Sequence, residues 1–170
     1  MKYTWIFTFS LVLLACTDEK PKEIQRNWNM NESTKLNKDL AVEQEIDIDL
    51  YLAQHESWQV DTTGSGLRIV WFKRTDGSLP KANQQAKVHY KIALLDGTQV
   101  YETEKDEYDI FRVDNAEMES GIHEGIKLMR VGEKAKLVFP SHLAHGLVGD
   151  MDKIPPLSPL VVDVELIGIE

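Results

Sequence analysis

The stretch AKVHYKIALL, residues 86–95, decides the fold class because its apolar and polar side chains alternate. One face of an extended chain here would be apolar and the other polar, with Val88, Tyr90, Ile92 and Leu94 against Lys87, His89 and Lys91. Such alternation is typical of a strand in an antiparallel sheet that buries one face. Asp96-Gly97 follows as a turn signal, so the chain is expected to reverse into a second strand at 98–102.

The surrounding sequence extends this sheet and supplies one helix to cover it. Further strands are expected at 67–73, 108–113, 134–139 and 159–169, with turn signals between them. Residues 118–130 are predicted to be helical, because Met118, Ile122, Ile126 and Met129 recur at helical spacing. Ser120 is a candidate N-cap, and Gly132 is a typical residue just beyond a helix end. The fold class is therefore α+β, one antiparallel sheet with a short helix on its apolar face, spanning residues 58–170.

A second helix is predicted before this domain, over residues 38–57. Its apolar face is expected to contain Val42, Ile46, Leu50 and Ala53. Residues 46–52 also alternate as a strand would, but the absence of Gly and Pro favours a helix. Since a helix of this length is marginally stable alone in water, it must dock. Packing on the following domain is favoured, and a role as a dimerisation or partner helix is the alternative.

Residues 1–15 have the proportions of a secretory signal peptide. Lys2 provides the positive start, and the segment 3–15 is mostly apolar, uncharged and too short to span a bilayer, which takes about 20 residues. The tetrapeptide Leu13-Leu14-Ala15-Cys16 contains the only cysteine and resembles the bacterial lipobox, in which the cysteine is acylated. Lipidation of Cys16 is predicted; the alternative is an ordinary signal peptide that contains a cysteine. Residues 16–37 are expected to be a polar tether.

Composition excludes several classes of protein. Of 170 residues, 42% are hydrophobic and 28% charged, as in globular proteins. The net charge of −9 argues against binding to nucleic acid phosphates and against electrostatic docking on anionic lipid. A single cysteine excludes a disulfide framework and a site of several thiolates. His142 and His145 are spaced as metal ligands can be, but with no nearby cysteine we expect neither a metal nor a cofactor.

Six short motifs, in order and at consistent spacing, resemble those of the FKBP-type peptidyl-prolyl isomerases. They are VHY (88–90), LDG (95–97), GIHEG (121–125), MRVGEKA (129–135), IPP (154–156) and LVVDVEL (160–166). The resemblance covers roughly residues 67–170. With the lipobox and the acidic helix, the chain also resembles FKBP-like lipoproteins associated with gliding motility. The family fold implied is a sheet of five or six antiparallel strands wrapped around a short helix, with a proline-binding cleft between them.

The resemblance also implies which residues form the cleft. Four are expected to act on the prolyl amide or its neighbouring carbonyls: Tyr90, Tyr101, His145 and Ile154. Six others are expected to line the substrate-binding walls: Val100, Phe111, Met118, Glu119, Ile122 and Val162. Tyr90 has a plainer alternative, as an ordinary core residue of its strand. Glu119 is expected to act through its backbone N–H, and His145, where the family has a tyrosine, through a ring nitrogen.

Several of these residues depart from the family pattern. Val100, Ile122 and Val162 stand where the family has aromatic side chains, so the pocket is expected to hold proline less specifically. The function implied is a peptidyl-prolyl isomerase, weakened by the altered pocket, that assists the folding of proline-containing envelope proteins from a lipid anchor. The predicted location is the bacterial envelope, on the periplasmic face or the cell surface. The alternative is a non-catalytic chaperone or a structural part of an envelope complex.

Overall fold

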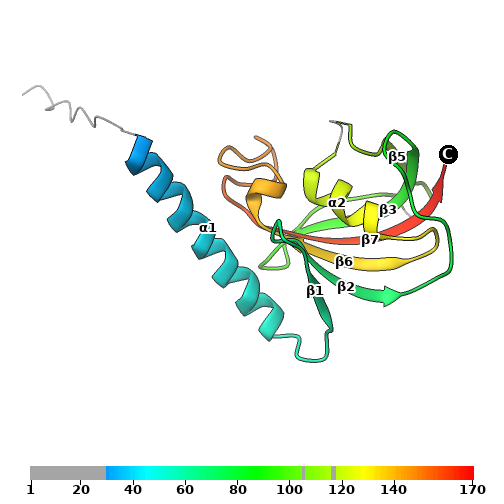
Figure 1. Cartoon of the computed structure of the whole chain (residues 1–170), viewed down its shortest axis with the longest axis horizontal. Coiled ribbons are helices and arrows are strands. Elements are labelled where there is room, and N and C mark those ends of the chain that lie inside the picture. Colours follow the sequence, from blue (N-terminus) through cyan, green and yellow to red (C-terminus); the bar gives the residue numbers. More distant parts are fainter. Residues whose placement is uncertain (1–29, 105, 116–117) are drawn as a thin grey trace, which may run out of the picture.

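A computed structural model describes residues 30–104, 106–115 and 118–170 of the chain. In this part of the chain seven antiparallel strands form one sheet in the order β1-β2-β6-β7-β3-β4, with β5 also paired to β3 (Figure 1). The strands are β1 (Val60–Thr62), β2 (Arg68–Lys73), β3 (Gln85–Leu94), β4 (Gln99–Glu102), β5 (Asp109–Arg112), β6 (Lys134–Phe139) and β7 (Leu160–Ile169). The predicted α+β class is confirmed. The sheet exceeds the expected five or six strands, because the short strand β1 pairs with β2.

The decisive stretch forms most of β3, which pairs with β7 along its length and with β4 and β5 on its other side. Val88 and Ile92 are buried on one face of the sheet, as their alternation predicted. Leu160, Val162, Val164 and Leu166 of β7 bury the same face. The hydrophobic core therefore lies on one side of the sheet.

The helix α2 (Ser120–Leu128) covers this face and lies close to β6. Two glycines permit the close approach: a Cβ at Gly121 would lie 2.7 Å from the Phe139 ring, and one at Gly125 would lie 2.4 Å from Leu137. The predicted N-cap, Ser120, is wrong. Glu119 is the N-cap and makes no side-chain cap bond, whereas the Ser120 hydroxyl donates to the Leu143 carbonyl at 3.1 Å.

The opposite face of the sheet holds the long helix α1 (Met30–Ala53), so residues 46–52 are helical and not a strand (Figure 1). The helix begins earlier than predicted, and residues 30–37, expected in the tether, belong to it. Residues 54–57, expected in the helix, follow it. The signal segment, Cys16 and the first part of the tether lie outside the described residues.

A different face of α1 docks from the one expected. Ile48 is fully buried against Val138 and Val161 on the outer side of β6 and β7. Gln44 is also buried, and its Oε1 accepts the backbone N–H of Ser141 at 2.8 Å. The predicted apolar face is instead open to solvent, with Val42 and Ile46 53% exposed and Leu50 60%. A polar residue takes the inner position because it satisfies a buried backbone N–H. Within the described residues, no helix is both long and apolar enough to cross a membrane.

Candidate active site

The apolar residues predicted to form the cleft meet in one cluster on the α2 side of the sheet. Five of them are buried in it, namely Val100 of β4, Phe111 of β5, Ile122 of α2, Ile154 of the loop before β7, and Val162 of β7. Tyr90, Tyr101 and Met118 are partly buried and pack against this cluster. Four elements and one loop supply these five buried residues of the core, which we call the floor of the candidate site, and we call the three partly buried residues its margin.

Tyr90 lies at this margin with its hydroxyl protonated. Burial raises the pKa of Tyr90, and a hydrogen bond to Asp109 raises it further. Asp109 begins β5, which pairs with β3 beside Tyr90. The tyrosine thus offers a fixed ring, and its hydroxyl is already engaged with a carboxylate.

Glu119 and His145 form a second polar pair at the margin. His145 Nε2 lies 2.9 Å from Glu119 Oε1, and the Glu119 side chain is 10% exposed. Its negative charge also raises the pKa of Tyr90, so the carboxylate lies near that hydroxyl. In the described part of the chain, Glu119 Oε2 is buried without a hydrogen-bond partner, which leaves an acceptor beside the cluster.

Tyr101 and Asp150 form the third pair, which the sequence did not reveal. The Tyr101 hydroxyl donates to Asp150 Oδ2 at 2.5 Å, while Oδ1 accepts the backbone N–H of Asp152 and of Ile154 at 2.9 and 2.7 Å. The tyrosine bond is the main reason why the pKa of Asp150 falls to about 2, and the same bond raises the pKa of Tyr101 to about 12. Asp150 thus fixes the loop before Ile154.

Comparison with known proteins identifies the family of this chain. The model of the family "FKBP-type peptidyl-prolyl cis-trans isomerase" matches residues 77–167, more than half of the chain. The chain belongs to this family. The FKBP-type peptidyl-prolyl cis-trans isomerase FkpA of Aeromonas hydrophila is 37% identical over 158 residues, which cover 91% of this chain and 58% of that protein. The Drosophila melanogaster isomerase Fkbp12 is 36% identical over 108 residues, 62% of this chain and 99% of that protein.

A solved structure supports the same assignment. The crystal structure of FkpA from Escherichia coli superposes with a TM-score of 0.67 at 32% identity, covering 82% of this chain and 64% of that one. The chain thus spans under two thirds of the FkpA relatives it matches. The residues predicted to form the cleft all lie within the matched range 77–167. The candidate site in this chain has aliphatic side chains at Val100, Ile122 and Val162. Its aromatic rings are those of Phe111 in the floor and of Tyr90 and Tyr101 at the margin.

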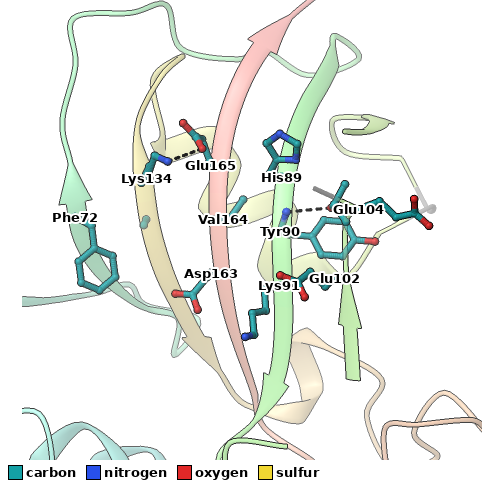
Figure 2. A pocket seen from close by; sticks show the side chains of 12 residues that line it. Phe72, His89, Tyr90, Lys91, Glu102, Glu104, Lys134, Asp163, Val164 and Glu165 are labelled. Carbon is teal, nitrogen blue, oxygen red and sulfur yellow. Dashed lines mark hydrogen bonds and ion pairs between the residues drawn. The ribbon is translucent and has the colours of Figure 1, made fainter. Parts of the chain in front are cut away.

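A groove of about 490 Å³ lies on the other face of the FKBP-type sheet, away from α2, and Tyr90 is among the residues that line it (Figure 2). Two cross-strand ion pairs lie on this face: Lys134 lies 2.7 Å from Glu165, and Lys136 lies 2.5 Å from Asp163. Such pairs stabilise a solvated sheet face. Of the residues predicted to form the cleft, only Tyr90 lines this groove.

The two histidines with metal-like spacing turn to different partners. His142 Nε2 lies 3.0 Å from the Ser65 carbonyl oxygen, whereas His145 contacts Glu119. Across residues 30–104, 106–115 and 118–170, no group of three or more His, Cys, Asp or Glu side chains is placed to hold a metal ion.

Proposed function

We propose that this chain is a peptidyl-prolyl cis-trans isomerase that assists the folding of exported, proline-containing envelope proteins. The observation that carries the proposal is the convergence of the predicted cleft residues on one apolar floor in a domain of the isomerase family. The clients are proposed from the signal-like N-terminus, and the catalytic activity is proposed from the family and the cleft.

The chemistry requires no nucleophile and no cofactor. Rotation about an X-Pro bond faces a barrier of about 18–20 kcal/mol, which arises from amide resonance. A twisted amide loses that resonance and its polarity, so a dry apolar floor favours it over the planar form. Uncatalysed exchange takes tens to hundreds of seconds, so even a modest lowering of the barrier accelerates folding.

The margin of the cleft would hold the carbonyls on either side of the proline. The backbone N–H of Glu119 lies at the start of α2, where N–H groups have no intrahelical partner. The ring nitrogen of His145 that faces away from Glu119 is a second donor when it carries a proton. The floor residue Ile154 contributes apolar contact to the proline ring.

The reduced aromatic content of the floor favours a second candidate function. With aliphatic residues at three wall positions, the cleft offers a proline less aromatic surface. A domain that binds proline-containing segments without isomerising them would act as a chaperone or as a structural part of an envelope complex. The likeness to gliding-motility lipoproteins belongs to this second candidate.

A protease-free isomerisation assay separates the two candidates. Short X-Pro peptides with varied residues before proline are tested with protein that begins at residue 17. We expect a rate clearly above the uncatalysed one, and a loss of about tenfold in kcat/KM in Ile154→Ala, which corresponds to about 1.4 kcal/mol of lost contact. Tyr90→Phe keeps the ring and tests the hydroxyl alone, and Ile167→Ala, at a 37% exposed position, is the control. A folded protein with no rate on any peptide would overturn the isomerase proposal, and binding of proline peptides without turnover would then support the second candidate.

We further propose that the chain is anchored to the envelope by acylation of Cys16. The support is the lipobox-like tetrapeptide after an apolar segment. Two or more acyl chains on one residue hold a protein firmly at a bilayer, whereas one chain holds it only marginally.

A further inference from the structure

The carboxylate of Glu119 is largely buried, and only one of its two oxygens is bonded. The side chain is 10% exposed, and Oε1 lies 2.9 Å from Nε2 of His145. Within the described residues, Oε2 is one of two buried side-chain polar atoms without a hydrogen-bond partner. A buried acceptor without a partner costs free energy, and proteins satisfy most such groups, so this oxygen requires an explanation.

This carboxylate lies at the place where a bound client would continue past its proline. Glu119 is the N-cap residue of α2, and its N–H is the proposed donor to a carbonyl next to proline. Met118, directly before it, packs against the apolar cluster. The negative charge of Glu119 also contributes to the raised pKa of Tyr90, so the carboxylate lies near that hydroxyl. A residue that flanks the bound proline would therefore lie within reach of this carboxylate.

Two further carboxylates lie at the same margin. Asp109 accepts a hydrogen bond from the Tyr90 hydroxyl, and Asp150 accepts one from the Tyr101 hydroxyl at 2.5 Å. Lys153 contributes a positive charge, with its Nζ 4.7 Å from the centre of the Tyr101 ring. Three carboxylates thus lie beside one lysine and one histidine, which leaves the margin acidic.

The spacing of these carboxylates suits a basic side chain better than a metal ion. In the part of the chain that the structure describes, no three His, Cys, Asp or Glu side chains are grouped closely enough to hold a metal. Carboxylates that surround one margin attract positive charge to it. The unbonded oxygen of Glu119 can accept a hydrogen bond from an ammonium or a guanidinium group, and such charge-assisted bonds are stronger than neutral ones.

Building on the proposed function, we infer that Glu119 selects clients that carry lysine or arginine next to proline. The basic side chain donates to Oε2, while His145 keeps its contact with Oε1. A neutral residue in the same place leaves Oε2 unbonded, and an acidic one is repelled by the margin. The preference therefore depends on the side chain of Glu119, whereas the proposed hold on the carbonyl depends on its backbone.

The test compares peptides that differ only at a residue flanking proline. One series carries Lys, Gln, Leu or Glu directly before proline, and a second series carries the same residues directly after it. The full chain is assayed by protease-free isomerisation as wild type, Glu119→Gln and Glu104→Gln. Glu119→Gln removes the charge and keeps the size of the side chain. Glu104→Gln, the control, removes an exposed carboxylate that lines the groove on the other face of the sheet.

We expect the wild-type kcat/KM to be about tenfold higher for Lys than for Gln at one of the flanking positions, and lowest for Glu. The ratio of Lys to Gln should fall below about twofold in Glu119→Gln and should be unchanged in Glu104→Gln. Raising the salt from about 0.01 M to about 1 M should also reduce the wild-type ratio, because salt screens the charges. Each ratio is measured on one protein sample, so a variant that is partly unfolded lowers both rates together.

Three results would overturn the inference. The first is a wild type that does not prefer Lys at either position, and the second is a preference that Glu119→Gln retains. The third is a preference that Glu119→Gln and Glu104→Gln reduce equally, because it would arise from the net charge of the chain and not from the margin.

A binding measurement separates this inference from the proposed function. If the wild type turns over none of the peptides, the isomerase proposal fails, and fluorescence anisotropy of the same peptides, carrying a dye, then tests the selection alone. Binding of the Lys peptide about tenfold tighter than the Gln peptide, with the difference lost in Glu119→Gln, would support the role of Glu119. Equal binding of the two peptides would overturn it.

Discussion

The Tyr101 hydroxyl donates a hydrogen bond to the Asp150 carboxylate, 49 residues later in the sequence. This bond connects β4 to the loop of residues 146–152. One oxygen of Asp150 binds the tyrosine, and the other caps two backbone N–H groups of the loop. Each bond favours the ionised carboxylate, so the folded state holds Asp150 with a pKa of about 2. The conformation of residues 146–152 is therefore held in part by the ionised carboxylate of Asp150.

This pairing predicts a specific loss of stability in acid. An aspartate in the unfolded chain has a pKa of about 3.9, so the stabilisation is complete above pH 4 and is lost as the pH falls towards about 2. In Tyr101→Phe the pKa of Asp150 should rise towards its ordinary value, and the acid-dependent part of the loss should shrink. Carboxyl NMR titration, with urea unfolding at pH 6 and pH 3, measures both. An unchanged Asp150 pKa in Tyr101→Phe would contradict the assignment, and Tyr108→Phe, at a 49% exposed position, is the control.

The sequence predicted the apolar floor of the site better than its polar margin. Val88, Ile92 and Val162 follow from strand alternation, and the family motifs place Ile122 and Ile154. The bond between Tyr101 and Asp150 leaves no local signal, because the two residues meet only when the sheet and the loop fold together. The role of Asp150 is therefore visible only in the folded chain.

Among the elements, α1 shows how an incomplete pattern misleads. Its sequence has apolar residues on more than one face, and spacing alone favoured Val42, Ile46 and Leu50. The docked side is set by two features of the domain: a small apolar patch at Val138 and Val161, and the backbone N–H of Ser141, which donates to Gln44. A buried Gln44 in that position is not predictable from hydrophobic periodicity.

The docking of α1 predicts a sharp contrast between two isoleucines two residues apart. Ile48→Ala removes the fully buried contact with Val138 and Val161, and we expect it to cost about 2–4 kcal/mol of unfolding free energy. Ile46→Ala changes a side chain that is 53% exposed and should cost under about 0.5 kcal/mol. Urea unfolding measures the difference, and hydrogen exchange should show faster opening of α1 in Ile48→Ala. Equal stabilities would mean that α1 is not docked in solution.

Across the whole molecule, the two faces of the sheet have separate roles. The helix α2 and the floor of the candidate site lie on one face. The contact with α1 and the groove lined by Lys134 and Glu165 lie on the other face. Helix α1 reaches the domain at one end of the sheet: Ile48 packs on the face away from α2, and Gln44 accepts the backbone N–H of Ser141 (Figure 1).

The acidity of the chain makes the proposed anchor testable at the same scale. Without residues 1–15 the chain would carry 18 Lys and Arg against 28 Asp and Glu, so anionic lipid would repel it. Membrane attachment would then depend on acyl chains, and high salt should not release the protein. Cells fed a clickable fatty acid should label the wild type but not Cys16→Ala, which should appear in the soluble fraction after lysis. Label retained on Cys16→Ala would remove the lipoprotein assignment, whereas an unlabelled wild type that is released by salt would indicate attachment through a protein partner.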